Sequence, residues 1–171
     1  MEIKVKKIHP DAVIPEFAHA TDTGFDLYAC EDTVIEGKSK AIVKTGLIFE
    51  LPDGWGVQIR NKSGITVKGC PIQVKTPKIK YTEDNEFYID YEYKTERVDL
   101  TVYIGTVDNA YRGEIGIMVK NESLREITIP KHTKLAQGVL EQVFHCDFVV
   151  VEDVNNTDRG SGGFGSTGTN K

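Results

Sequence analysis

The sequence is poor in cysteine and has no apolar run of membrane-spanning length. Its three cysteines are an odd number without a Cys-x-x-Cys pair, which indicates unpaired thiols in a reducing compartment. Its four histidines also lack the spacing of metal ligands. No apolar stretch follows the charges at the N-terminus, so we expect no signal peptide. These absences together predict a soluble, cytoplasmic protein that makes no use of a membrane.

An excess of basic residues is missing as well. The formal net charge is -5, whereas surfaces that bind nucleic acids are usually basic, so we expect no direct nucleic-acid partner. A polyphosphate ligand would therefore need a few local Lys or Arg side chains, backbone amides or a divalent cation. The length of 171 residues fits one domain with a sizeable core.

The first half of the chain contains a clear hairpin pattern. Residues 41–51 read as a long strand with a bend at Gly46. Pro52-Asp53-Gly54 then reads as a turn, and residues 55–60 read as the returning strand. The sequence therefore predicts that residues 41–60 pair with each other as a hairpin.

Strand patterns continue into the second half of the chain. Residues 134–143 have the apolar content of a helix or a buried strand, and their β-branched residues, with the run at 148–151, favour strands. Turn signals recur throughout the sequence, and no convincing amphipathic helix interrupts them. The sequence therefore predicts an all-β sandwich or jelly roll.

The composition changes within residues 70–104. Four of the seven tyrosines stand among acidic residues at 81–93, and residues 87–93 alternate in the manner of a strand. We interpret this region as an extra hairpin or small subdomain. Its aromatic side chains would cover either their own core or a partner, and the pattern does not choose between the two.

The glycine-punctuated stretch from Gly105 to Glu114 is a candidate site. It places Asp108 three residues ahead of Tyr111 and beside an arginine. A carboxylate next to an aromatic ring suits a site that holds a water and a flat, sugar-bearing substrate. The alternative is a hairpin tip whose Asp and Asn side chains serve the turn backbone.

Two further segments carry polar groups that could bind an anion or a metal-bound water. Ser63 and Gly64 follow a strand, where a junction into a helix offers a hydroxyl and backbone amides to an anion, although Ser is also a routine N-cap. Asp26 lies between Phe25 and Leu27, and strand alternation points it to the opposite face from these two. It is either a solvated aspartate or a ligand to a metal-bound water.

The C-terminal residues 155–171 are rich in glycine and cannot pack a core. This composition predicts a flexible tail, but an arginine, a phenylalanine and clustered hydroxyls would also suit a lid that closes on a phosphate and a base. The segment approaches a Walker motif, yet Ser166 stands where the lysine belongs. We therefore do not expect a P-loop.

Taken in order, five segments resemble the motifs of the homotrimeric dUTP pyrophosphatase (dUTPase) family. They are residues 23–29, 61–65, 105–114, 134–137 and 159–168, and the resemblance covers nearly the whole chain except 70–104. It implies a dUTPase-like jelly-roll trimer with shared active sites that hydrolyses dUTP to dUMP and pyrophosphate with Mg²⁺. It also implies a β domain over 1–154 that contains the insert, and a C-terminal active-site tail over 155–171.

The resemblance assigns roles to individual residues. Asp108 would be the general base that takes a proton from the water attacking the α-phosphorus. Tyr111 would lie against the deoxyribose and leave no room for a 2′-hydroxyl, while backbone groups read the uracil. Asp26 would bind Mg²⁺ through a water.

The remaining roles concern the triphosphate and the base. Lys62, Ser63, Gly64 and Gln137 would hold the phosphate chain. In the tail, Phe164 would stack on uracil, and the other binding residues would be Arg159, Gly165, Ser166 and Thr167, with Arg159, Ser166 and Thr167 reaching the γ-phosphate. Lys62 stands where the family usually has Arg, which keeps the charge and loses the bidentate geometry.

Two alternatives to a plain dUTPase stay open. Ser63 and Asp108 are 45 positions apart, far more than the family's usual link, and phage-encoded members with such inserts are linked to regulatory proteins such as repressors. Residues 77–96 would then bind a regulatory partner, by imitating DNA or by offering a patch to a basic protein, in the cytoplasm of a host cell. The related dCTP deaminase shares the fold, but the complete tail and the Asp-x-x-Tyr motif favour the hydrolase.

Overall fold

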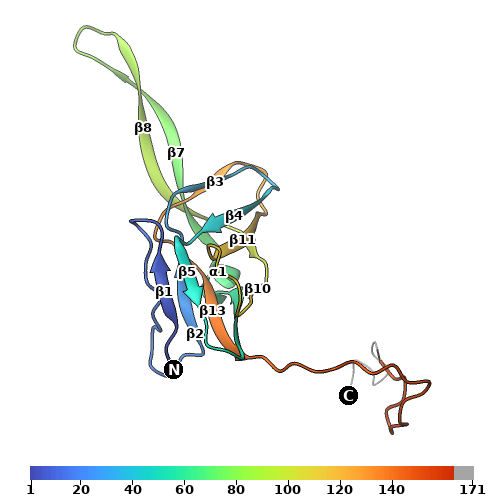
Figure 1. The fold of residues 1–171 in the computed structure, drawn as a ribbon. Helices are drawn as coiled ribbons and strands as arrows, with labels where there is room; N and C mark the ends of the chain where they lie inside the picture. The colour runs from blue at the N-terminus through green and yellow to red at the C-terminus, as the bar shows by residue number, and fades with distance from the viewer. Residues whose placement is uncertain (164–171) are drawn as a thin grey trace.

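Antiparallel strands make up most of the chain. The computed structural model describes residues 1–163, and in that range its one helix spans a few residues and none is long and apolar enough to cross a membrane. Figure 1 shows a β-rich body from which a long hairpin and the C-terminal segment project. The elements are β1 (Lys4–Lys7), β2 (Gly24–Tyr28), β3 (Thr33–Ile35), β4 (Lys40–Lys44), β5 (Leu47–Glu50), β6 (Trp55–Asn61), α1 (Ser63–Lys68), β7 (Cys70–Tyr81), β8 (Phe87–Val98), β9 (Leu100–Val102), β10 (Gly105–Val107), β11 (Gly116–Asn121), β12 (Ile127–Ile129) and β13 (Lys134–Gln142).

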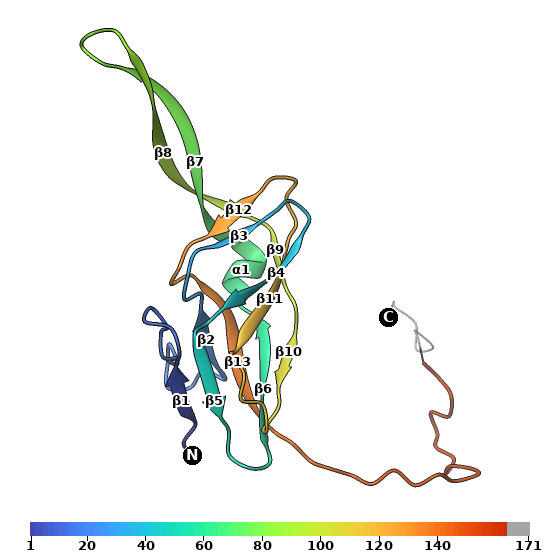
Figure 2. The same ribbon diagram turned by 45° about the horizontal axis from the view of Figure 1, so that its top comes forward.

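Four antiparallel sheets form the body, with strand orders β1-β5, β10-β6-β13-β2, β4-β11-β9 and β3-β12-β7-β8 (Figure 2). Their apolar side chains meet in one core, which includes Leu27, Ile117 and Leu135, each with no exposed surface. Outside the β7–β8 hairpin, the paired strands are not consecutive in the sequence, as in a jelly roll. The predicted fold class, an all-β jelly roll with an inserted hairpin, is confirmed.

The sheet β10-β6-β13-β2 carries most of the candidate site residues. Gly138 on β13 lies opposite Phe25 on β2, and a Cβ on Gly138 would come within 2.3 Å of the Phe25 ring. The ring therefore occupies the space that a side chain on β13 would take. This close packing fixes β2 against β13 from the core side and leaves the other face of both strands for polar groups.

The predicted hairpin over residues 41–60 is wrong. The strand breaks at Gly46, which has a φ of 68°, and its two parts join different sheets: β4 pairs with β11, and β5 pairs with β1. Glu114 accepts a hydrogen bond from the Gly46 amide at 2.8 Å, and the Ile115 amide donates to Leu47 at 2.8 Å. Contacts made by a distant segment therefore decide where the strand ends.

The inserted segment is a long antiparallel hairpin. β7 and β8 pair continuously from Cys70 and Val98 at the base to Tyr81 and Phe87 near the tip. Its base joins the body through β12, and its outer part extends beyond the other strands in both ribbon views. The prediction of an extra hairpin within residues 70–104 is confirmed.

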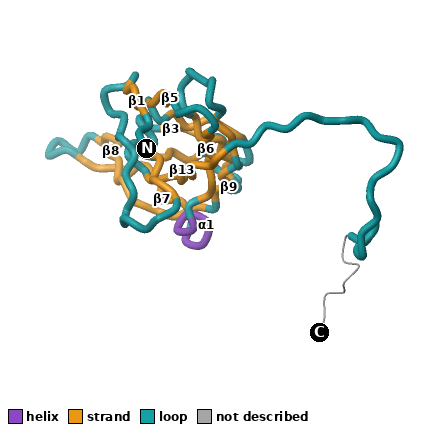
Figure 3. The backbone as a smooth tube through the Cα atoms, turned by 60° about the horizontal axis from the view of Figure 1, so that its bottom comes forward, coloured by secondary structure: helices purple, strands orange, loops and turns teal. Residues whose placement is uncertain are grey.

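The C-terminal segment leaves the body after β13. The predicted strand at 134–143 is confirmed as β13, but the one at 148–151 is wrong, since the structure has no strand between 143 and 163. Figure 3 shows this segment running away from the body as a loop, and Phe148 and Val150 are 94% and 99% exposed. Within the described chain no strand lies beside it to complete a ladder.

Candidate active site

The junction between β6 and α1 presents Lys62, Ser63 and Gly64 as a continuous run. Lys62 is the N-cap residue, and its carbonyl accepts the hydrogen bonds that close the first helical turn, from the amides of Ile65 at 2.9 Å and Thr66 at 3.1 Å. Ser63 is therefore the first helical residue, and no side chain caps the helix. The amides of Ser63 and Gly64 precede the first intrahelical donors, so they can meet an anion.

Asp26 lies at the centre of a cluster with two lysines. It is 2% exposed, and each of its carboxylate oxygens lies against an ammonium group: one accepts a hydrogen bond from Lys62 Nζ at 2.6 Å, and the other forms an ion pair with Lys134 Nζ at 3.0 Å. Burial alone would raise the pKa of Asp26, but the hydrogen bonds from Lys62 and Lys134 outweigh it and hold the pKa below its usual value. The carboxylate is therefore ionised, and each of its oxygens is paired with an ammonium group.

Gln137 lies next to this cluster on the same side of the sheet. It is directly opposite Asp26 on β2 and directly opposite Arg60 on β6, and opposite residues of antiparallel strands point to the same face. Arg60 is paired with Glu141. The structure thus brings together three of the predicted site residues, Asp26, Lys62 and Gln137, with Ser63 and Gly64 following directly on Lys62.

Asp108 follows β10 and begins a tight turn. Its carbonyl accepts a hydrogen bond from the Tyr111 amide at 3.1 Å. Its neighbour Asn109 serves the backbone, because its amide nitrogen donates to the carbonyls of Leu51 at 3.1 Å and Pro52 at 2.6 Å. The Asp108 side chain is exposed and makes no hydrogen bond to any described residue. The turn therefore uses the asparagine and leaves the aspartate available.

The Asp108 side chain lines a cavity of about 840 Å³ between the ends of β6, β10 and β13. Trp55, Gln58 and Glu141 contribute to the walls, and His145 closes the rim from the start of the C-terminal segment. Tyr111 does not line this cavity. It is 46% exposed, and its hydroxyl donates to the Glu114 carbonyl at 3.1 Å, so the ring folds back over its own turn.

Arg159, the one predicted tail residue within the described range, is separated from this site. Arg159 is exposed, and its Nε donates to the Gly162 carbonyl at 2.9 Å within a local turn. Phe164, Gly165, Ser166 and Thr167 lie outside the described residues. One chain therefore presents the predicted residues as separate groups: the Asp26 cluster, the Asp108 turn and Arg159.

Sequence reasoning missed one member of the site, Lys134. It is the first residue of β13 and of the segment Lys134–Gln137, in which the glutamine alone was assigned a role. Its ammonium group lies 5.5 Å from the centre of the Tyr28 ring as well as 3.0 Å from Asp26. The Asp26 carboxylate and then the Tyr28 hydroxyl, both of which accept from this ammonium group, raise the pKa of Lys134. The signal was present in the sequence as a lysine three residues before Gln137.

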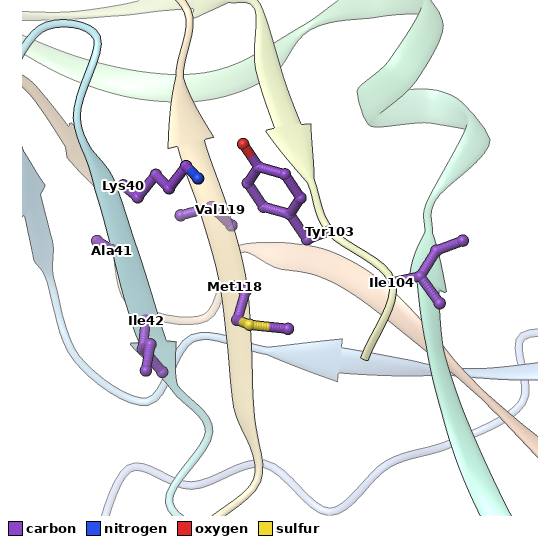
Figure 4. A pocket seen from close by; sticks show the side chains of 7 residues that line it. All are labelled: Lys40, Ala41, Ile42, Tyr103, Ile104, Met118 and Val119. Atoms are coloured by element: carbon purple, nitrogen blue, oxygen red, sulfur yellow. The ribbon is translucent and has the colours of Figure 1, made fainter. Parts of the chain in front are cut away.

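A second hollow lies on the sheet β4-β11-β9, away from these residues. Figure 4 shows its lining from β4, β11 and the segment after β9. It has a volume of about 540 Å³, and its apolar side chains are largely open to solvent: Ile42 is 65%, Ile104 72% and Met118 42% exposed. It holds no candidate catalytic residue.

Comparison with known sequences accounts for this arrangement. The sequence profile of the dUTPase family matches residues 11–79 and 95–168. The chain belongs to the dUTPase family. The unmatched residues 80–94 form the outer part of the β7–β8 hairpin, so the insert lies where the family profile has no counterpart.

Full-length relatives agree with this membership. A deoxyuridine 5′-triphosphate nucleotidohydrolase of Picosynechococcus sp. is 36% identical over 169 residues, which is 99% of this chain and 100% of that protein. The corresponding protein of Helicobacter pylori strain Shi470 is 34% identical over 171 residues, covering 100% of this chain and 99% of the relative. The dUTPase therefore resembles these enzymes from end to end.

Solved structures with the same fold come from Staphylococcus phages. A mutant dUTPase of bacteriophage 80alpha with dUpNHpp has a TM-score of 0.77 at 23% identity, covering 98% of this chain and 99% of that one. The phage phi11 dUTPase that visualises a species-specific insert has a TM-score of 0.69 at 21% identity, covering 92% and 100%. A phi11 mutant described with a structural Mg(II) ion has a TM-score of 0.67 at 22% identity, covering 90% and 98%.

A magnesium ion held through Asp26 does not fit this dUTPase. Both oxygens of Asp26 are already paired with ammonium groups, and a hydrated cation would face two positive charges there. Among residues 1–163, no group of three or more His, Cys, Asp and Glu side chains is arranged to hold a metal. The expectation that Asp26 binds Mg²⁺ through a water is therefore not supported by its surroundings.

Proposed function

We propose that this dUTPase hydrolyses dUTP to dUMP and pyrophosphate by attack of water on the α-phosphorus. Family membership over both flanks of the insert supports the reaction. One observation carries the assignment of the base: Asp108 presents an exposed carboxylate, free of hydrogen bonds to described residues, at a cavity of about 840 Å³. A carboxylate in that position takes a proton from the attacking water.

The substrate is bound by two separate groups of residues, one around Lys62 and one around Asp108. The amides of Ser63 and Gly64, with Lys62 and Gln137, hold the phosphate chain by charge-assisted hydrogen bonds. Tyr111 packs against the deoxyribose and excludes a 2′-hydroxyl by shape. Backbone groups of the segment that carries Asp108 recognise the uracil.

The C-terminal segment completes the site in this proposal. Arg159 and the residues Phe164, Gly165, Ser166 and Thr167 close over the nucleotide, with the ring on the uracil and the polar groups on the γ-phosphate. Ordering such a segment costs about 1–2 kcal/mol per residue. The tail therefore closes when nucleotide is bound, and excludes bulk water from the reaction.

We further propose a homotrimer in which neighbouring chains share each site. Within one chain the Asp108 cavity has no contribution from Lys62, Gln137 or Arg159, so a single copy does not assemble the full set. Two apolar surfaces are open for contacts between copies: the hollow on β4-β11-β9, and the C-terminal segment with Phe148 and Val150. Burial of such surfaces drives subunit association.

Magnesium enters this proposal as part of the substrate. The triphosphate supplies oxygen ligands, and Mg²⁺ commonly binds proteins through substrate phosphates and waters with few protein ligands. When bound, such an ion would supply charge neutralisation on the phosphates, while Lys62, Ser63, Gly64 and Gln137 of this chain would hold the triphosphate in place.

A turnover assay tests the proposed reaction. Intact protein should release pyrophosphate from dUTP when Mg²⁺ is present, and should release none from dCTP or UTP. A variant that lacks residues 155–171 should lose turnover while its body stays folded. Release of ammonia from dCTP would instead identify a deaminase and overturn the proposal.

The β7–β8 hairpin favours a second role, which is to bind a regulatory protein. Opposite residues alternate between two faces. One face is apolar and open to solvent, and its exposed side chains are Ile79, Tyr81, Phe87, Ile89, Tyr91 and Tyr93, between 44% and 70% exposed. Apolar side chains at every second position of a strand are usual where that face of a hairpin packs against another surface.

The opposite face of the hairpin is charged but internally neutralised. Lys78 pairs with Glu92, and Lys80 pairs with Asp90. Such a ladder does not present the uniform negative charge that imitation of DNA requires. The carboxylates at the tip, Glu83, Asp84 and Glu86, make no ion pair among the described residues. The hairpin therefore fits a protein partner with an apolar patch bordered by basic residues.

Two tyrosines on β8 provide a matched test of this role. Tyr91 lies on the apolar face and is 44% exposed, whereas Tyr88 lies on the charged face and is 47% exposed. Deletion of residues 77–96 should spare dUTP turnover and abolish binding of a host or phage regulatory protein. Tyr91→Ser should reproduce that loss, and Tyr88→Ser should not. Equal effects of the two substitutions would overturn this role. So would the finding that intact dUTPase retains no protein that the deletion variant fails to retain.

A further inference from the structure

In the cluster of Asp26, Lys62 and Lys134 the carboxylate is buried, which is true of no other ion pair among the described residues. The Asp26 side chain is 3% exposed, whereas the acid is at least 31% exposed in every other ion pair of residues 1–163. Burying a carboxylate costs several kcal/mol unless it is paired and hydrogen-bonded. Pairing with both lysines offsets this cost, so the cluster holds the two ammonium groups against Asp26.

The two lysines reach Asp26 from different parts of the chain. Lys62 comes from the N-cap of α1, and Lys134 is the first residue of β13. Their side chains are 27% and 50% exposed, so each ammonium group keeps contact with solvent. A lysine ammonium has three donors, and one bond to Asp26 leaves two on each lysine for a ligand.

The net charge of the cluster selects the kind of ligand. Two ammonium groups and one carboxylate sum to one positive charge, whereas the nearby Arg60 is matched by Glu141. The cluster also lies beside Gln137, which is opposite Asp26 in the sheet, and beside the run Ser63-Gly64. An anion with several oxygens fits these donors, and a cation does not.

From this geometry we propose that Lys134 is a second phosphate-binding side chain, and that Asp26 is a positioning residue that holds Lys62 and Lys134 toward the same polyphosphate. This inference rests on the proposed hydrolysis of dUTP and replaces the metal role expected for Asp26. Lys62 and Lys134 together supply two point charges. They compensate for the absence of a bidentate arginine at position 62.

Binding of dUpNHpp in excess EDTA tests the proposal, because it measures contacts of the protein with the triphosphate when no metal is present. Lys134→Gln should weaken this binding about tenfold, the loss expected for one charge-assisted hydrogen bond, and should weaken dUMP binding less. Lys134→Arg should restore it. Lys131→Gln is the matched control, because Lys131 is a half-exposed lysine paired with Asp11 on the same connection into β13, and it should bind like wild type.

Asp26→Asn separates the positioning role from a metal role. It should weaken dUpNHpp binding in EDTA and leave the Mg²⁺ concentration for half-maximal turnover unchanged. A shift in that concentration with unchanged binding in EDTA would overturn the inference, as would wild-type affinity in Lys134→Gln. If wild-type protein binds dUpNHpp but never turns over dUTP, the proposed reaction fails, and the comparison between variants still decides the role of Lys134.

Discussion

Asp26 on β2 and Gln137 on β13 lie directly opposite each other in the antiparallel register. Their side chains therefore share the outer face of the sheet, while Phe25 and Gly138, also opposite each other, meet on the core face. The same two strands thus serve packing on one side and chemistry on the other. This division allows substitutions that test each function separately.

The first prediction concerns the general base. Asp108→Asn removes the group that takes the proton from water, and general-base catalysis contributes about 10²–10⁴-fold to rate. Turnover of dUTP should fall about 100-fold or more, while dUpNHpp still binds. Asp53→Asn is the control, because Asp53 lines the same cavity and should keep its activity. Full activity in Asp108→Asn would refute the assigned role.

The second prediction concerns the core face of the active-site sheet. Gly138→Ala places a Cβ within 2.3 Å of the Phe25 ring, and overpacking of this kind costs about 1–3 kcal/mol. Urea unfolding at fixed protein concentration should show this loss of stability. In Gly64→Ala the new Cβ meets nothing within 4 Å, so stability should not fall, and it should rise slightly because alanine favours the helical conformation of α1 more than glycine does. A Gly138→Ala protein as stable as wild type would contradict the packing described for Phe25.

The third prediction concerns the reactivity of the three thiols. Burial raises the pKa of Cys70 to about 12 and also raises that of Cys30, whereas Cys146 is exposed. At pH 8 one thiol per chain should react with a maleimide in the native protein, and all three should react in guanidinium chloride. Cys146→Ser should abolish the native reaction. Rapid labelling of Cys70 without unfolding would show that the thiol at the base of β7 is not buried.

The thiol of Cys70 also makes stability depend on alkaline pH. Its folded pKa lies above the usual value of 9, so the unfolded chain loses this proton first as pH rises. Stability is therefore fully present below about pH 9 and falls between pH 9 and 12. Cys70→Ala should reduce this decline when unfolding is measured across that range.

The fourth prediction concerns acid. The two lysine bonds hold the pKa of Asp26 below its usual value of 3.8. Asp26 therefore contributes stability above that pH, which is lost as pH falls through its lower folded value. Asp26→Asn should lower stability at pH 7 and flatten the decline below pH 4. Asp84→Asn at the exposed hairpin tip controls for the change in net charge, and an equal effect of both would argue against the cluster.

Local patterns in the sequence determined much of this protein. Strand alternation and turn residues predict the all-β class, the extra hairpin and β13, because these depend on neighbours along the chain. The ordered motifs identify the family and select Asp108, Lys62 and Gln137. Because side chains along a strand alternate between its two faces, the sequence also determines that Tyr88 and Tyr91 point to opposite faces of one strand.

Tertiary structure decided what depends on partners distant in sequence. The break at Gly46 comes from hydrogen bonds to residues 114–115, 68 or more positions away, and the run at 148–151 is not a strand because no described strand edge lies beside it. Lys134 joins Lys62 at Asp26 only because β13 pairs with β2 while the end of β6 turns into α1. Those pairings set the charge around Asp26, and so favour an anion over a metal ion.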